Sequence, residues 1–224
     1  MVFADILASL IHDMKNSLGM VINTLEELEC GRLPGQPQQE SHLRVLRQEA
    51  KRLNNKLLEL LTLYKIENGR ISANVEELNL SEFLEEIVLE NRVSAEAQGV
   101  VFEWQCAPDL TGYFDEGLVR GVINSLVGNG LRYTRQRLLL TAEQADGYLA
   151  LRLEDDGDGF PAGMLAAQQA TSDQDVAFGD GRTHLGIYFA GMVARLHRNR
   201  ERQGAIRLSN GGRLPGGCFS LLLP

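Results

Sequence analysis

The chain has 224 residues, of which 44% are hydrophobic and 23% charged, as in a soluble protein of one large domain or two small ones. A formal net charge of −8 at neutral pH argues against a nucleic-acid partner held by general electrostatic attraction. The three cysteines have no metal-binding or redox spacing. No apolar run approaches the roughly 20 residues that span a bilayer, and no signal peptide is recognisable. We therefore expect a cytoplasmic protein, or the cytoplasmic part of a longer or membrane-associated one.

Two heptad-spaced apolar stripes fill the first third of the sequence. Apolar residues recur at alternating steps of four and three from Leu7 to Leu28, and again from Leu43 to Tyr64. Between them, residues 31–37 contain two glycines and two prolines, which end the first helix. The pattern predicts an antiparallel helical hairpin, and its extra apolar positions predict a homodimer in which a second copy completes a four-helix bundle. A hairpin that only caps the following domain is the alternative.

The first predicted helix has a histidine beside its apolar stripe. His12 follows the stripe residue Ile11, so we expect its side chain to flank the core and reach solvent. Asp13 could fix the imidazole tautomer and accept a proton, and Asn16 lies one turn further along the same face. A neutral imidazole can attack phosphorus, so we interpret His12 as a phosphoryl acceptor served by these two residues. A solvated polar helix face is the alternative.

The rest of the chain alternates predicted strands and helices. Gly69 ends the hairpin, and Ser81 can cap a helix that runs to Gln98. Two further helices are expected over residues 115–133 and 183–196, and strands over residues 100–104, 137–141, 148–153, 205–208 and 218–222. Strands that cluster between recurring helices predict an α/β sandwich, with helices covering one face of a mixed sheet.

Three segments of this second part have residue types suited to a nucleotide. Asn124 and Asn129 lie on one predicted helix, where we expect them to be near one another in angle. Their carboxamide oxygens suit Mg²⁺, and Arg132 could pair with phosphate. A third segment, residues 179–187, opens a helix whose free N–H groups could attract phosphate. The polar residues 162–178 before it are typical of a mobile lid.

The remaining segment, Asp155 to Gly159, directly follows a strand. Asp155 can accept a hydrogen bond from an exocyclic amine such as that of adenine, and Gly157 and Gly159 let the backbone lie against a flat base. An acidic turn is the alternative. A calcium loop of the EF-hand type is excluded, because no glutamate stands at the required twelfth position and the segment emerges from a strand.

Taken in order, these motifs resemble the catalytic core of a sensor histidine kinase of two-component signalling, over nearly the whole chain. The resembling segments are the phosphoacceptor box His12–Leu18, the linker Tyr64–Arg70, the asparagine box Asn124–Thr134, the first glycine box Asp155–Gly159 and the closing hairpin Gly204–Leu221. The resemblance implies an α+β protein. Residues 1–68 would be the dimerisation and phosphoacceptor domain, and residues 69–224 an ATP-binding catalytic domain of the GHKL type.

The resemblance also implies roles for individual residues. Asn129 would bind Mg²⁺ and Asp155 would read adenine. The implied nucleotide contacts are Asn124, Asn129, Arg132, Tyr133, Asp155, Gly157, Gly159, Arg182, Thr183, His184, Leu185 and Gly186. The implied activity is ATP-dependent autophosphorylation of His12, followed by transfer to an aspartate of a response regulator. Asn16 suggests the reverse dephosphorylation as well.

The second glycine box departs from the family pattern, which reads roughly Gly-x-Gly-Leu-Gly-Leu. Here the segment 182–187 keeps only Gly186. Arg182 and His184 put side chains where backbone is expected to wrap phosphates; Arg182 could bind phosphate itself, or both could block the site. The alternative function is therefore an ATP-independent dimeric phosphotransfer or scaffold protein on the same fold.

Overall fold

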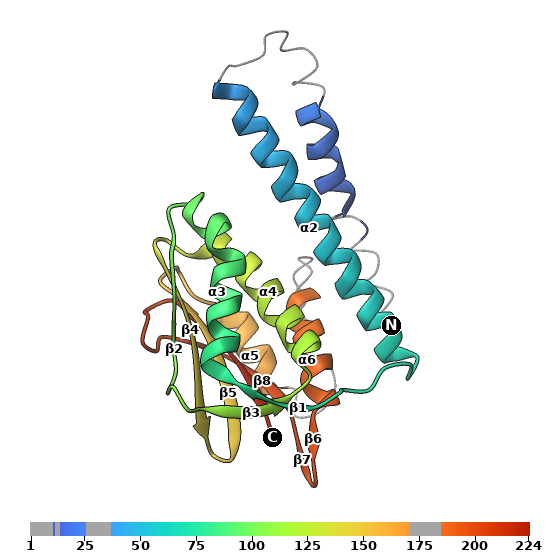
Figure 1. Ribbon diagram of the computed structural model, residues 1–224, viewed down its shortest axis with the longest axis vertical. Coiled ribbons are helices and arrows are strands. Elements are labelled where there is room, and N and C mark those ends of the chain that lie inside the picture. Colours follow the sequence, from blue (N-terminus) through green and yellow to red (C-terminus); the bar gives the residue numbers. More distant parts are fainter. Residues whose placement is uncertain (1–10, 12–13, 26–36, 171–184) are drawn as a thin grey trace.

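The computed structural model describes residues 11, 14–25, 37–170 and 185–224 (Figure 1). A helical arm consists of the segment 14–25 lying beside the long helix α2 (Pro37–Glu67). An α+β body follows, made of β1 (Glu76–Asn79), α3 (Leu80–Glu96), β2 (Val101–Gln105), β3 (Thr111–Phe114), α4 (Glu116–Tyr133), β4 (Arg137–Ala145), β5 (Tyr148–Asp155), α5 (Ala162–Ala170), α6 (Leu185–Leu196), β6 (Arg198–Asn199), β7 (Arg202–Gln203), β8 (Ala205–Asn210) and β9 (Gly217–Leu223). Of the helices in these described ranges, none is both long and apolar enough to cross a membrane.

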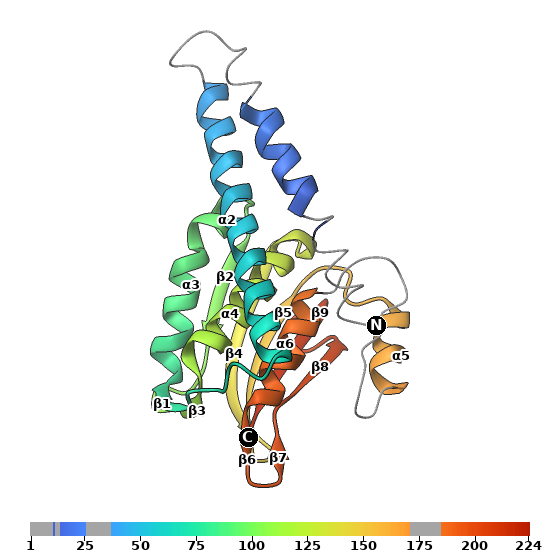
Figure 2. The ribbon, with the colours of Figure 1, turned by 90° about the vertical axis from the view of Figure 1, so that its right-hand side faces the viewer.

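The main sheet of the body has the strand order β2-β4-β5-β9-β8. β2 runs parallel to β4, and the other neighbours are antiparallel. Alternate residues of a strand point to opposite faces. On β5, Leu149, Leu151 and Leu153 join the core beneath α3, α4 and α6, so Arg152 and Glu154 lie on the opposite face. The α+β class and the mixed sheet covered by helices on one face are thus confirmed (Figure 2).

Capping side chains fix where the helices of the body begin. The carboxylate of Asp115 accepts a hydrogen bond from the Leu118 amide at 2.9 Å and starts α4 where the sequence predicts it. α3 begins two positions earlier than expected, because the Asn79 carboxamide accepts a hydrogen bond from the Glu82 amide at 3.1 Å. The expectation that Ser81 caps this helix is wrong, since asparagine caps as well as serine and stands earlier in the chain.

β1 lies in the segment Ile71–Leu80, where the sequence has β character in part, whereas β3, β6, β7 and the helix α5 are absent from the sequence-based prediction. β1 pairs with β3, and β6 pairs with β7, each in a separate two-stranded ladder. β3 packs so closely on the sheet that a Cβ added at Gly112 would lie 2.5 Å from the Leu149 side chain. α5 occupies the first half of the expected lid, residues 162–178, and the part of that segment from residue 171 lies outside the described residues.

The C-terminal half of α2 packs against the body. Leu63 is fully buried in the core of the body, and Leu60 and Ile66 pack against that core. Near the end of the helix, the Tyr188 hydroxyl of α6 donates a hydrogen bond to Glu67 Oε1 at 2.9 Å. The arm is therefore in direct contact with the helical layer of the body (Figure 2).

Several positions of the predicted apolar stripe of the arm are exposed to solvent. Ile11, Leu18 and Leu25 are 57%, 51% and 46% exposed, whereas Ser17 and Thr24 are buried. Among the described residues, ten of the sixteen exposed large hydrophobic side chains belong to the arm: Ile11, Leu18, Met20, Ile22, Leu25, Leu43, Leu57, Leu58, Leu61 and Tyr64. Such a concentration of exposed apolar surface on one part of a protein marks an interaction site.

Candidate nucleotide site

One face of α4 meets the start of α6. Ser125 and Asn129 are four residues apart on α4 and therefore share a face. A Cβ added at Gly186, the second residue of α6, would lie 2.9 Å from Ser125 Oγ and 3.0 Å from Asn129 Nδ2. A larger residue would displace one of these two side chains. Gly186 thus brings the second glycine segment directly against the asparagine box.

Ser125 is a site residue that the sequence analysis missed. Its side chain is 8% exposed, and its Oγ has no hydrogen-bond partner among the described residues. Leaving a buried hydroxyl unpaired is costly, so this oxygen is suited to meet a ligand that binds beside Asn129. The four-residue spacing from Asn129 is the sequence signal that identifies it.

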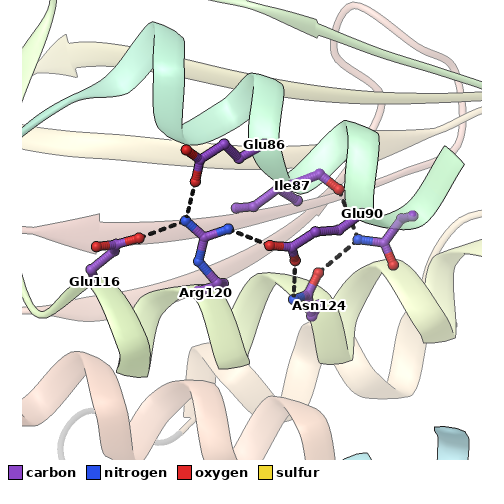
Figure 3. Close-up of polar contacts among 7 residues, drawn as sticks. Glu86, Ile87, Glu90, Glu116, Arg120 and Asn124 are labelled. Atoms are coloured by element: carbon purple, nitrogen blue, oxygen red, sulfur yellow. Dashed lines mark hydrogen bonds and ion pairs between the residues drawn. The ribbon is translucent and has the colours of Figure 1, made fainter.

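Asn124, by contrast, binds the neighbouring helix α3 (Figure 3). Its Nδ2 donates a hydrogen bond to Glu90 Oε2 at 3.0 Å, and its Oδ1 accepts one from Asn91 Nδ2 at 2.7 Å. The expectation that Asn124 and Asn129 are near one another in angle is wrong. Five residues on a helix of 3.6 residues per turn place two side chains about 140° apart.

Arg120 extends the same network between α3 and α4 (Figure 3). Its guanidinium contacts Glu86 at 2.6 Å, Glu90 at 2.5 Å and Glu116 at 2.6 Å. Burial opposes the charge of Arg120, but hydrogen bonds and attraction from the three carboxylates raise its pKa above the usual value. Three carboxylates from α3 and α4 contact this guanidinium, so the network joins the two helices.

The asparagine box ends against the first glycine box. A Cβ added at Gly157 would lie 2.2 Å from the carbonyl oxygen of Tyr133, the last residue of α4. The neighbouring Asp156 accepts hydrogen bonds from Thr134 Oγ1 at 2.9 Å and from the next two backbone amides at 2.8 and 3.0 Å. Burial would raise the pKa of Asp156, but these hydrogen bonds outweigh it and lower the pKa to about 2. Asp156, which the sequence analysis did not single out, therefore ties the two motifs together.

Asp155 is held by glycine amides. Its Oδ1 accepts hydrogen bonds from the amide of Gly157 at 2.8 Å and from that of Gly217 at 3.2 Å. A Cβ added at Gly216 would lie 2.3 Å from the same oxygen. Within the described part of the chain, Asp155 Oδ2 has no hydrogen-bond partner. The carboxylate is therefore fixed through one oxygen and offers the other to an amine.

The closing hairpin clamps the other end of the first glycine box. Asn210, the last residue of β8, accepts a hydrogen bond from the Phe160 amide at 2.7 Å and donates one to the Phe160 carbonyl at 2.9 Å. Gly159 adopts a φ of 78°, a conformation that favours glycine. These two hydrogen bonds thus hold together two segments that are 50 residues apart in the chain.

A cleft of about 260 Å³ lies between α3, α4 and the arm. Asn124, Ser125, Asn129 and Arg132 line it from α4, and Lys56 and Glu59 line it from α2. Lys56 Nζ and Glu59 Oε2 are 3.0 Å apart, and Glu59 is only 5% exposed. The face of α4 that carries Asn129 thus lines this cleft, opposite α2.

The other predicted site residues fall into two groups. His12, Asp13, Arg182, Thr183 and His184 lie outside the described residues. Asn16 is exposed on the helical segment 14–25, and Tyr133 is 67% exposed. Leu185 is 2% exposed and belongs to the hydrophobic core, so it anchors the start of α6.

The assembled residues fit an adenine nucleotide. Asp155 offers an acceptor for an exocyclic amine, and the glycines around it let the Tyr133 carbonyl and the Asn210 side chain pack closely against this segment. The Asn129 carboxamide and the orphaned Ser125 hydroxyl are oxygen ligands of the kind that Mg²⁺ prefers. The described residues contain no group of three or more His, Cys, Asp or Glu placed to hold a metal ion. A Mg²⁺ ion here would take most of its ligands from phosphates and water, as it commonly does.

The chain is similar to curated sensor proteins. No profile of a known protein family matches the chain. Sensor protein SrrB of Staphylococcus aureus (strain N315) is 22% identical over 198 residues, which cover 86% of this chain and 34% of that protein. The chain spans about a third of the length of the curated relatives it matches.

Solved structures with a similar fold are histidine kinases. The Acinetobacter baumannii histidine kinase AdeS superposes with a TM-score of 0.65 at 18% identity, covering 95% of this chain and 96% of that one. The catalytic domain of histidine kinase ThkA matches 67% of this chain and 95% of its own, with a TM-score of 0.53 at 19% identity. The cytoplasmic segment of histidine kinase QseC matches 76% of this chain and 94% of its own, with a TM-score of 0.52 at 14% identity. The resemblance to a sensor histidine kinase catalytic core, expected from the sequence, is thus confirmed.

Proposed function

We propose that the chain is the catalytic core of a two-component sensor histidine kinase, which phosphorylates its own His12 from ATP and passes the phosphoryl group to an aspartate of a response regulator. Residues 1–68 form the dimerisation and phosphoacceptor domain, and residues 69–224 the ATP-binding domain. The observation that carries the proposal is the close approach of Gly186 to Ser125 and Asn129. It brings two of the motifs that the resemblance assigns to ATP into contact.

Each part of the site has a role in this reaction. Asp155 would accept a hydrogen bond from the adenine amine, and Asn129 would hold Mg²⁺, which shields the charge of the phosphates. Arg132, which lines the cleft, would pair with phosphate. A ring nitrogen of His12 attacks the γ-phosphorus of ATP: an N–P bond forms while the bond from that phosphorus to the β-phosphate oxygen breaks and ADP leaves, and Asp13 takes the proton from the other ring nitrogen. Catalysis rests on positioning and electrostatics, as in phosphoryl transfer generally.

The arm supports a homodimer. Its exposed apolar side chains include Leu18 and Leu25 on the first helical segment and Leu57 and Leu61 on α2. A second copy would cover these side chains in a four-helix bundle. These ten side chains are roughly half exposed, and burying the rest of their apolar surface is favourable, so a second copy packed on the arm can hold two chains together. His12 would flank this bundle, where both a nucleotide and a regulator can approach it, and Asn16 would assist dephosphorylation of the regulator.

The direct test is phosphorylation with γ-labelled ATP and Mg²⁺. The wild-type chain should acquire an acid-labile, base-stable label that His12→Gln lacks, and added regulator should remove it. An absence of label in the wild type would overturn the kinase. If the unlabelled protein still accepts phosphate on His12 from a phosphorylated regulator, the ATP-independent phosphotransfer function replaces it. We place the reaction in the cytoplasm, where ATP and regulators are present.

A further inference from the structure

Asp155 has an acidic neighbour that faces the other side of the sheet. Glu154 is 3% exposed, and it lies on the face of β5 opposite to the core residue Leu153. Its Oε2 accepts hydrogen bonds from the backbone amides of Arg213 at 2.6 Å and Leu214 at 3.1 Å. A buried carboxylate requires partners of this kind, and here they come from the loop of residues 211–216 between β8 and β9.

The same loop is held at its far end by Asp155. The Gly216 amide donates to the Asp155 carbonyl at 2.9 Å, and the Gly217 amide donates to Asp155 Oδ1 at 3.2 Å. The Gly211 amide closes the loop on the Gly216 carbonyl at 2.8 Å. Glu154 and Asp155, which are consecutive on β5, therefore hydrogen-bond to the two ends of one loop from opposite faces of the sheet.

The loop lies close to both carboxylates because it has a glycine at each contact. A Cβ added at Gly212 would lie 2.5 Å from Glu154 Oε2, and one added at Gly216 would lie 2.3 Å from Asp155 Oδ1. Leu214 is 6% exposed, so its side chain also anchors the loop. A shift of the loop at Glu154 would reach Gly216 and then the amide of Gly217 at the start of β9, which is one of the two amides that hold Asp155.

We propose that Glu154 is a positioning residue for base recognition: it fixes the β8–β9 loop so that the Gly217 amide aligns the Asp155 carboxylate with an incoming base. The inference rests on the proposed function, in which Asp155 Oδ2 accepts a hydrogen bond from adenine. A purine with an amine at position 6 donates to this oxygen, whereas one with a carbonyl there cannot. Glu154 thus sets the preference for ATP over GTP without touching either.

The experiment compares three variants of the full chain by calorimetric titration with Mg-ATP and Mg-GTP. Glu154→Ala removes the acceptor and should weaken ATP binding about tenfold, the factor expected when one hydrogen bond is misaligned, while GTP binding is unchanged. Glu154→Gln keeps an acceptor oxygen and should restore the preference. Glu103→Ala is the matched control, because Glu103 lies on the same sheet face but pairs only with Arg137, at 3.2 Å.

Amide hydrogen exchange, followed by NMR in the absence of nucleotide, provides a readout independent of ATP. Glu154→Ala should accelerate exchange at Arg213 and Leu214 and also at Gly217, which Glu154 does not touch. Gly212→Ala perturbs the same contact from the loop side and should act alike if Glu154→Ala does not fold.

Two results would overturn the inference: unchanged exchange at Gly217, or an equal loss of affinity for ATP and GTP, which would assign Glu154 a purely structural role. A wild-type chain that binds neither nucleotide would instead overturn the proposed function. The exchange of Gly217 would then still decide whether Glu154 holds the loop against Asp155.

Discussion

Replacing Gly157 by alanine should damage both stability and nucleotide binding for a steric reason alone. Gly157 is not among the residues with positive φ, so alanine can adopt its backbone conformation. The added Cβ, however, would lie 2.2 Å from the Tyr133 carbonyl oxygen, and contacts under 3.0 Å are essentially never observed. One of the two segments must therefore move by about 0.8 Å.

Neither segment is free to move cheaply. Tyr133 ends α4, and the residues that follow it are hydrogen-bonded to Asp156. Forcing extra volume into a packed site costs about 1–3 kcal/mol, and we expect Gly157→Ala to lose this much stability. ATP affinity should fall with it, because the Gly157 amide also holds Asp155.

Gly128→Ala is the matched control on the neighbouring helix. A Cβ at Gly128 would meet nothing within 4 Å, and alanine is favoured over glycine in a helix by about 1 kcal/mol. The two Gly→Ala variants should therefore differ by about 2–4 kcal/mol, with opposite signs relative to wild type. Urea titrations followed by circular dichroism at one protein concentration measure this difference. Equal midpoints for the two variants would refute the packing of Gly157 on Tyr133.

Three further predictions test other parts of the site. Asn129→Ala should weaken Mg-ATP binding in calorimetry. Asn124→Ala should leave this binding intact but lower the stability of the protein by about 1–2 kcal/mol, because its α3 partners lose a hydrogen bond. The reverse outcome would contradict the proposal that Asn129, and not Asn124, contacts the nucleotide. The lowered pKa of Asp156, about 2 against 3.8, means that its stabilising contribution is present above pH 3.8 and disappears as the pH falls toward 2. Asp156→Asn should accordingly flatten the pH dependence of stability in that window, and an unchanged slope in acid titrations would contradict the assignment. Leu61→Glu, at one of the exposed apolar positions of the arm, should yield monomers in sedimentation. Leu89→Glu, at a comparably exposed site on α3, should remain dimeric.

Much of the fold is readable from local signals. The Asp115 cap marks the start of α4, and Asp146 and Gly147, both with positive φ, mark the turn between β4 and β5. β3 lacks such a signal, because it has only four residues and its partner β1 lies about 35 positions earlier in the chain. Their pairing depends on packing against Leu149, which no local pattern reveals.

The site was predicted motif by motif, and its errors have a common physical cause. The sequence locates Asn129, Asp155 and the glycines, but it does not state which neighbours share their faces. Counting in steps of 3.6 residues places Ser125, rather than Asn124, on the same face of α4 as Asn129. The role of Glu154 depends on a loop about 60 residues away, so it emerges only from the folded chain.

This site should bind ATP even though its second glycine segment retains only Gly186. Calorimetric titration of the wild-type chain with ATP and Mg²⁺ measures this binding. We predict one nucleotide per chain, with binding lost in Asp155→Ala and unaffected in Glu103→Ala. An absence of binding to the folded wild-type chain, or equal affinity in Asp155→Ala, would contradict the account.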